Sequence, residues 1–225
     1  MEIDVRKEAI KLYNETWDLL DIPAESRSDE QNLEMIHKTH ASNYLWSLVG
    51  EPKNFARGEW QVSHVYAVLG CGELALKYGE ASLKIVQESG IGGKDLAFGF
   101  EAVARAYAVM GDYDKAREYK AKGLEAASLL EDEDDRKYIE GELNGIVTLN
   151  PGQKMFFDFV MERVLEGKKA DIQKIMAESF KRQADGTFTK EYMAETAPAI
   201  ITLLRPECVE EFKQAAAHMS GQLQS

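Results

Sequence analysis

A five-residue pattern occurs twice in this sequence and constrains the fold more than any other feature. Tyr-Ala-Val-Leu-Gly at Tyr66–Gly70 returns as Tyr-Ala-Val-Met-Gly at Tyr107–Gly111, an offset of 41 residues (107 − 66). Three further pairs match at this offset: Ala75 and Ala116, Tyr78 and Tyr119, Leu83 and Leu124. An internal period of about 20–50 residues is typical of proteins built from stacked supersecondary units. The sequence therefore predicts a repeat protein, a class that presents extended binding surfaces.

Composition and charge predict a soluble cytoplasmic protein. Hydrophobic residues make up 44% of the 225 positions and charged residues 29%, as in ordinary globular chains. The formal net charge of −12 repels phosphate backbones, so we expect no nucleic-acid partner. The N-terminus lacks an apolar signal-like segment, and no uncharged stretch approaches the roughly 18 residues of a membrane span. We therefore expect no membrane association.

Long amphipathic segments bounded by proline and glycine predict an all-α fold. In the first part of the chain we expect helices over 4–20, 28–49, 52–70, 73–88, 95–110, from the Gly111-Asp112 turn to 130, and 136–146. In the second part we expect helices over 154–166, 170–182, 189–197 with a bend after Pro198, and 206–219. The Pro-Gly pair within 148–153 predicts a linker. It separates a helical-repeat domain, 1–147, with three antiparallel helix pairs and a closing helix, from a small helical domain, 154–225.

The segment 97–126 resembles a tetratricopeptide repeat. The matching positions are Ala104, Tyr107, the Gly111-Asp112-Tyr113 turn, Ala116 and Leu124. The chain departs from the motif at Lys120, where an aromatic residue is usual, and the closing proline is missing. The 41-residue offset also exceeds the usual period of about 34. The region 40–146 is similar to uncharacterised prokaryotic repeat proteins with a His-Ala-Ser and Arg-Gly-Glu-Trp-Gln pattern, here His40–Ser42 and Arg57–Gln61. The resemblance implies a short right-handed superhelix with a concave groove.

The same resemblance implies which side chains face the groove. They are Arg57, Trp60 and His64 on the third expected helix and Phe98, Glu101 and Arg105 on the fifth. Guanidinium groups and aromatic rings suit a peptide carboxylate or a small polar ligand. The alternative is a buried polar network between helix pairs, for instance Arg105 with Glu101 four residues earlier. The leading hypothesis is a non-enzymatic scaffold that binds a peptide or protein segment and needs no cofactor.

A rival hypothesis is a small-molecule sensor or metal-dependent enzyme that uses the neighbourhood of His37, His40, His64 and Glu59. A metal site requires at least three converging ligands, and the sequence shows no His-Glu-x-x-His pattern. His37 and His40 share a helix side with an apolar stripe that we expect to face the core: Leu33, Ile36, Tyr44 and Leu48. The pattern therefore favours histidines that are hydrogen-bonded within the core.

Neither the cysteines nor the last part of the chain predicts chemistry. Cys71 and Cys208 lack metal or redox spacing, so we expect reduced thiols, with Cys71 buried at a tight turn. The region from Lys154 onward is small enough to be only marginally stable alone. Its helices are expected to place Met155, Phe156, Phe159, Val160 and Val164 along one side. Such an apolar face predicts docking onto the repeat domain or a homodimer.

Overall fold

The fold comes from a computed structural model that describes residues 4–222. Eleven α-helices and two short 3₁₀-helices form its regular structure, and no β-strand occurs within that range. The all-α prediction is confirmed. The chain divides into two compact units, one ending at Thr148 and the other beginning at Leu149.

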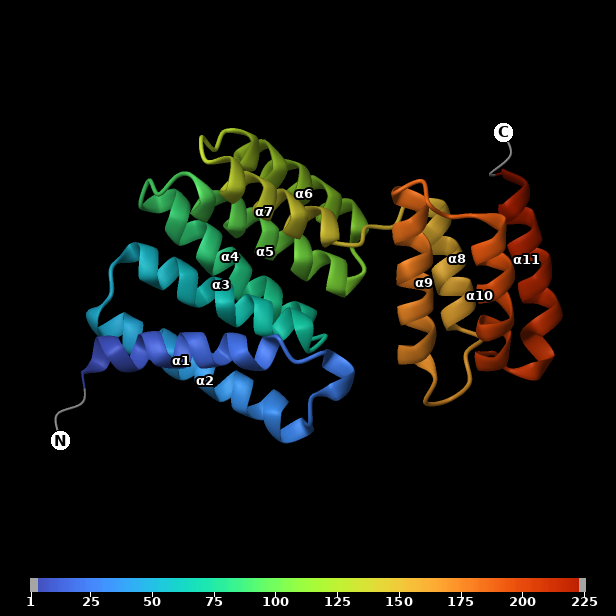
Figure 1. Cartoon of the computed structure of the whole chain (residues 1–225), viewed down its shortest axis with the longest axis horizontal. Coiled ribbons are helices and arrows are strands. Elements are labelled where there is room, and N and C mark those ends of the chain that lie inside the picture. Colours follow the sequence, from blue (N-terminus) through green and yellow to red (C-terminus); the bar gives the residue numbers. More distant parts are fainter. Residues whose placement is uncertain (1–3, 223–225) are drawn as a thin grey trace. The chain divides into compact units, whose positions relative to one another are not determined.

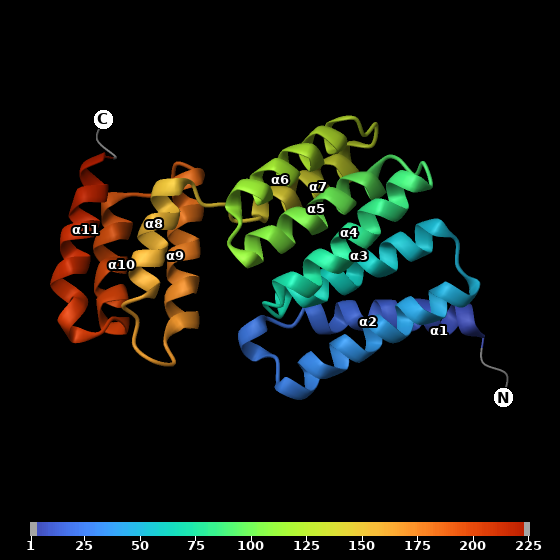
Figure 2. The same ribbon diagram turned by 180° about the vertical axis from the view of Figure 1, so that it is seen from behind.

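The first unit contains seven α-helices and one 3₁₀-turn (Figure 1). They are α1 (Val5–Leu20), η1 (Ala24–Ser26), α2 (Asp29–Val49), α3 (Pro52–Val68), α4 (Gly72–Glu88), α5 (Lys94–Met110), α6 (Tyr113–Ser128) and α7 (Glu133–Gly145). Each α-helix packs against the next, and α5 also contacts both α3 and α7. Figure 2 shows these helices from behind. The odd-numbered helices α3, α5 and α7 are therefore neighbours although the chain passes through α4 and α6 between them.

Local capping signals explain where the helices begin. Ser28 and Gln31 form the predicted capping box at α2: the Gln31 amide donates to Ser28 Oγ (3.2 Å) and the Ser28 amide to Gln31 Oε1 (2.9 Å). Helix α7 begins at Glu133, earlier than the expected 136. The reason is Asp132, whose Oδ1 accepts from the amide of Asp135 at 2.8 Å and caps the acidic first turn.

The two copies of the five-residue pattern adopt one helix-ending conformation. Gly70 and Gly111 have φ angles of 76° and 77°, a region in which glycine carries no steric penalty. The amide after each glycine reaches back to a tyrosine carbonyl: Cys71 N to Tyr66 O (2.8 Å) and Asp112 N to Tyr107 O (3.0 Å). This is the hydrogen-bond pattern of a Schellman-type helix end, and it turns the chain at once into the following helix.

The buried face of α2 differs from the expected stripe. Leu33, Tyr44 and Leu48 are 54%, 65% and 57% exposed, and His37 is exposed as well, so their expected burial is wrong. The buried residues of α2 are Met35, Thr39, Ser42 and Trp46. Two of them are polar, and hydrogen bonds to neighbouring helices satisfy their buried hydroxyls. Ser42 Oγ donates to Ala9 O (2.8 Å) and Thr39 Oγ1 donates to Gln61 Oε1 (3.3 Å). Cys71 is exposed, which also corrects the expectation of a buried thiol.

The second unit contains four α-helices and one 3₁₀-turn. They are α8 (Pro151–Met161), α9 (Lys169–Ala184), α10 (Lys190–Leu203), η2 (Pro206–Cys208) and α11 (Val209–Gln222). A short antiparallel bridge between Val164 and Leu204 joins the loop before α9 to the end of α10. The core includes Val160, Ile172, Met176, Phe180, Ile200 and Phe212. Of the apolar side expected on α8, Val160 is buried and Met155 is 73% exposed.

Candidate functional site

A cavity of about 260 Å³ opens on the first unit where its odd-numbered helices meet. Its lining consists of Tyr13 and Trp17 from α1, Ala56, Arg57 and Trp60 from α3, Ser82 and Val86 from α4, Lys94, Asp95 and Phe98 from α5, and Asp135 and Tyr138 from α7. Helices that are distant in sequence thus contribute to one surface. Ser82 links α4 to α3 in this lining, since its Oγ donates to Ala56 O at 2.7 Å.

An aromatic row crosses this cavity, formed by Trp17, Trp60, Phe98 and Tyr138. Adjacent rings have centroid separations of 5.6 Å (Trp17–Trp60), 5.1 Å (Trp60–Phe98) and 6.1 Å (Phe98–Tyr138). These separations lie within the range of favourable aromatic pairs. Each ring comes from a different helix, α1, α3, α5 and α7 in turn, so the row extends across all four odd-numbered helices of the first unit. Tyr138, at one end, is 59% exposed.

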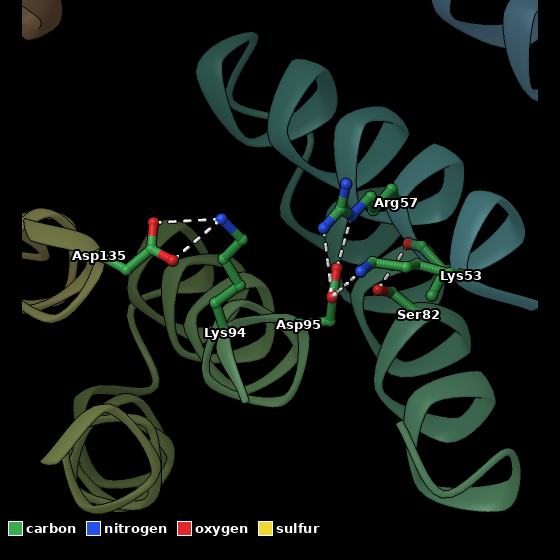
Figure 3. Close-up of polar contacts among 7 residues, drawn as sticks. Lys53, Arg57, Ser82, Lys94, Asp95 and Asp135 are labelled. Carbon is green, nitrogen blue, oxygen red and sulfur yellow. Dashed lines mark hydrogen bonds and ion pairs between the residues drawn. The ribbon is translucent and has the colours of Figure 1, made fainter. Parts of the chain in front are cut away.

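Ion pairs border the cavity on its α3, α5 and α7 sides (Figure 3). Arg57 donates to Asp95 with two nitrogens: Nε to Oδ1 (2.6 Å) and the second nitrogen to Oδ2 (3.2 Å). Lys53 Nζ lies 3.7 Å from the same carboxylate, and Lys94 Nζ donates to both oxygens of Asp135 (3.1 and 3.0 Å). The hydrogen bonds to Asp95 raise the pKa of Arg57. These pairs involve three cations and two carboxylates, a local positive balance on an acidic protein.

A hydrogen-bonded network beneath the row holds Trp60 in place. Glu101 is 1% exposed, and its two carboxylate oxygens accept from Trp60 Nε1 (3.0 Å) and Arg105 Nε (2.6 Å). Arg105 also donates to Glu142 Oε2 at 3.1 Å. Burial opposes the charge of Arg105, but the two carboxylates outweigh it and raise the pKa of Arg105. Neither Glu101 nor Arg105 lines the cavity. Their role is to fix the orientation of Trp60 through its hydrogen bond to Glu101.

His64 packs against two adjacent tryptophans of the row. Its ring is 5.4 Å from Trp17 and 5.5 Å from Trp60, and its buried Nδ1 has no hydrogen-bond partner within the described part of the chain. Burial, and secondarily the charge of Arg105, lower the pKa of His64 to about 3. The imidazole is consequently neutral near pH 7 and packs as an aromatic ring.

The structure thus divides the six groove residues expected from the sequence. Arg57, Trp60 and Phe98 line the cavity, whereas His64, Glu101 and Arg105 support it from beneath. The prediction missed the other nine lining residues, among them Tyr13, Trp17, Lys94, Asp95, Asp135 and Tyr138. The repeat offset relates only α3–α4 to α5–α6, so no register pointed to α1 or α7. Asp135 belongs to an acidic run that fits a solvated helix start equally well.

The histidines of the rival hypothesis occupy three separate environments. His37 is exposed, and His64 is buried beneath the aromatic row. His40 Nε2 is 2.9 Å from the hydroxyl of Tyr66, and its ring centroid is 5.5 Å from that of Tyr78. Among the described residues, no group of three or more His, Cys, Asp or Glu side chains is placed to hold a metal ion.

Glu59, also part of that hypothesis, lies with His40, Asn43 and Tyr78 beside an open depression of about 420 Å³. Burial raises the pKa of Glu59, and Asn43 Nδ2 donates to its Oε1 at 3.1 Å. The other oxygen, Oε2, is buried with no partner in the described structure, so a ligand in the depression could not reach it without rearrangement. This arrangement gives no direct support to catalysis at Glu59.

Within residues 4–222, none of the helices has the length and apolar character needed to cross a membrane. Comparison of the chain with protein families, with curated proteins and with solved structures finds no significant match.

Proposed function

We propose that the protein is a non-enzymatic helical-repeat scaffold that binds a peptide or protein segment along the aromatic row. In this proposal the first unit is a short tetratricopeptide-like right-handed superhelix whose concave side carries the row. The single observation that carries the proposal is the row itself, because four rings from four helices line one open cavity. Exposed aromatic residues together with arginine are typical of the residues that dominate binding energy at interfaces.

The row is preorganised for binding. Trp60 is fixed by its hydrogen bond to buried Glu101, and Arg57 by its two bonds to Asp95, which is 8% exposed. Side chains that are already ordered lose little conformational entropy when a ligand binds. A cavity that combines aromatic rings with fixed charged groups suits the insertion of an apolar or aromatic side chain next to a polar group.

The charges at the rim favour an acidic segment. The Arg57 side chain is 43% exposed and the Lys53 side chain 54%, so both can contact a ligand carboxylate while they retain Asp95. Arginine pairs well with carboxylates because its donors form a planar fork. We therefore propose a ligand in which an apolar or aromatic side chain is followed closely by an acidic residue or a C-terminal carboxylate.

Selection from a random displayed-peptide library on the full-length protein tests this proposal. The enriched peptides are then titrated by calorimetry against Tyr138→Ala and against Tyr44→Ala. Both tyrosines are exposed helix residues, at 59% and 65%, but only Tyr138 lines the cavity. We expect Tyr138→Ala to weaken binding by about tenfold, which corresponds to one good aromatic contact, and Tyr44→Ala to leave it unchanged.

Arg57→Ala gives an independent check on the rim. It should weaken binding of peptides that carry a carboxylate more than binding of their amidated or neutral versions. The matched control is Arg117→Ala, since Arg117 pairs with Asp114 on α6, away from the cavity lining. Equal loss in both arginine variants, or selective loss in Tyr44→Ala, would contradict binding at the aromatic row.

A further inference from the structure

The second unit contains a cavity of about 320 Å³ between its four α-helices. The apolar part of the lining is Phe156, Met176, Phe180, Phe188, Met193, Ala197, Ile200, Phe212 and Ala216, with Gly152 at one edge. The polar part is Asn150, Gln153, Ser179, Gln183 and Thr196. The cavity is partly open to solvent and is not an enclosed void in the core. Its volume falls within the range of small-molecule sites.

The chemistry of the lining disfavours a charged ligand. Among the described residues that line the cavity there is no Asp, Glu, Lys, Arg or His. Burying an ion without a counter-charge is costly, so a carboxylate or ammonium would be disfavoured here. The hydroxyls of Ser179 and Thr196 are already used: they donate to the carbonyls of Ile175 and Tyr192, one turn earlier on their own helices. Their donor hydrogens are therefore not available to a ligand, and most of the remaining lining is apolar.

One end of the cavity offers hydrogen-bond donors. Gln153 Nε2 donates to Gln183 Oε1 at 2.7 Å, and Gln153 Oε1 accepts from the Asn150 amide at 3.0 Å. Asn150 Oδ1 in turn accepts from the Gln153 amide at 2.9 Å. These bonds occupy the acceptors, while the side-chain NH₂ groups of Gln183, which is half-buried, and Asn150, which is exposed, bond to no other described residue. Each such group carries two donor hydrogens.

We propose that the second unit binds a small, neutral, mostly apolar molecule with one hydrogen-bond acceptor at its end. The apolar body lies among Phe156, Met176, Met193 and Ile200. The acceptor, a carbonyl, ether or hydroxyl oxygen, bonds to the side-chain amide of Gln183. This site lies entirely within the second unit and does not depend on peptide binding by the first.

Two related dyes test the apolar and neutral character of the site in the full-length protein. N-phenyl-1-naphthylamine is neutral, and 8-anilino-1-naphthalenesulfonate is the same ring system with a sulfonate. Fluorescence titration should give saturable, one-to-one binding of the neutral dye, at least about tenfold tighter than binding of the sulfonate. Equal affinity, or no saturable binding of the neutral dye, would overturn the proposal.

A matched pair of substitutions on α10 tests the location. Ala197 lines the cavity, whereas Ala199, two residues later on the same helix, is exposed. Ala197→Phe should fill part of the space and weaken binding of the neutral dye by about tenfold or more, while Ala199→Phe leaves it unchanged. Unaltered binding in a folded Ala197→Phe protein would contradict the assignment.

Methyl-labelled methionine gives a measurement on the unaltered chain, so the outcome does not depend on a variant that folds. Met176 and Met193 line the cavity, while Met35 and Met110 belong to the first unit and Met155 is 73% exposed. The neutral dye should shift the methyl resonances of Met176 and Met193 in proportion to occupancy. Shifts confined to Met35, Met110 or Met155 would place the dye elsewhere and refute the proposal.

Discussion

Replacing Glu101 by glutamine is the sharpest test of how the site is held together. The carboxylate is 1% exposed and accepts hydrogen bonds from two donors, Trp60 Nε1 and Arg105 Nε. Glutamine has the same shape but offers only one acceptor oxygen, and its NH₂ group is itself a donor. Whichever way the amide turns, one donor of the network therefore faces another donor.

The size of the effect follows from these contacts. An unsatisfied buried hydrogen-bonding group costs about 1–3 kcal/mol. Loss of one partner from a buried ion pair costs about 3–5 kcal/mol. Arg105 retains Glu142 at 3.1 Å, and the Glu142 side chain is 35% exposed, so the second cost is only partly incurred. We expect Glu101→Gln to lower the free energy of unfolding by about 3 kcal/mol, or about 6–12 °C in midpoint for a unit of this size.

Tryptophan fluorescence in a urea titration measures this quantity for the first unit. The three tryptophans, Trp17, Trp46 and Trp60, all precede residue 149, so the signal reports on that unit alone. The control is Glu118→Gln, the same chemical change at an exposed pair with Lys122, which should leave the midpoint unchanged. If Glu101→Gln unfolds at the wild-type urea concentration, the network does not fix Trp60 and the reasoning fails.

Three further predictions concern His64, the thiols and the second unit. Burial, and secondarily the charge of Arg105, lower the pKa of His64 from 6.5 to about 3 in the folded protein. Between pH 6.5 and pH 3 the unfolded chain therefore binds a proton at His64 that the folded protein does not bind. The free energy of unfolding consequently decreases as the pH falls through this range. Relative to His64→Phe, the wild type should therefore lose about 2 kcal/mol of unfolding free energy between pH 7 and pH 5 in urea titrations, and an identical pH dependence would contradict a buried neutral imidazole. Cys71 is exposed and Cys208 buried, so Ellman's reagent should react rapidly with one thiol in the native protein and with both in denaturant; two fast thiols would show that the second unit opens readily. If the second unit mediates a homodimer, one of the two roles expected from its apolar side, light scattering should give a dimer for the full chain and a monomer for residues 1–150, and an unchanged oligomeric state would refute that role.

Local signals made most of the helix boundaries predictable. Ser28 with Gln31 and Pro52 mark helix starts through interactions within a single turn, and Gly70 and Gly111 mark helix ends through their positive φ angles. The buried face of α2 was not predictable in the same way. Ser42 can be buried because its hydroxyl donates to Ala9 O, which lies 33 residues away in the sequence. The hydropathy pattern of α2 alone does not reveal this contact.

The candidate site was predictable in part for the same reason. Arg57, Trp60 and Phe98 could be placed because the repeat pattern gives a register for α3 and α5. Trp17 and Tyr138 complete the row from α1 and α7, and only the packing of the helices brings them there. The sequence did not predict which charged residues form ion pairs with one another. Asp95, for example, pairs with Arg57 across 38 residues. The sequence also left open whether these residues form a binding surface or a buried network. In the structure Glu101 and Arg105 form a buried network, while Arg57, Trp60 and Phe98 line a cavity.

The central claim, that a peptide binds along the aromatic row, is tested most directly by the tryptophan indole N–H resonances of the wild-type protein. Trp17 and Trp60 belong to the row, whereas Trp46 is 7% exposed on α2 and lies under Arg6, outside the cavity lining. Titration with a library-selected peptide should shift the Trp17 and Trp60 signals to saturation and leave Trp46 unchanged. Binding of the same peptide that shifts only Trp46, or none of the three, would contradict the account.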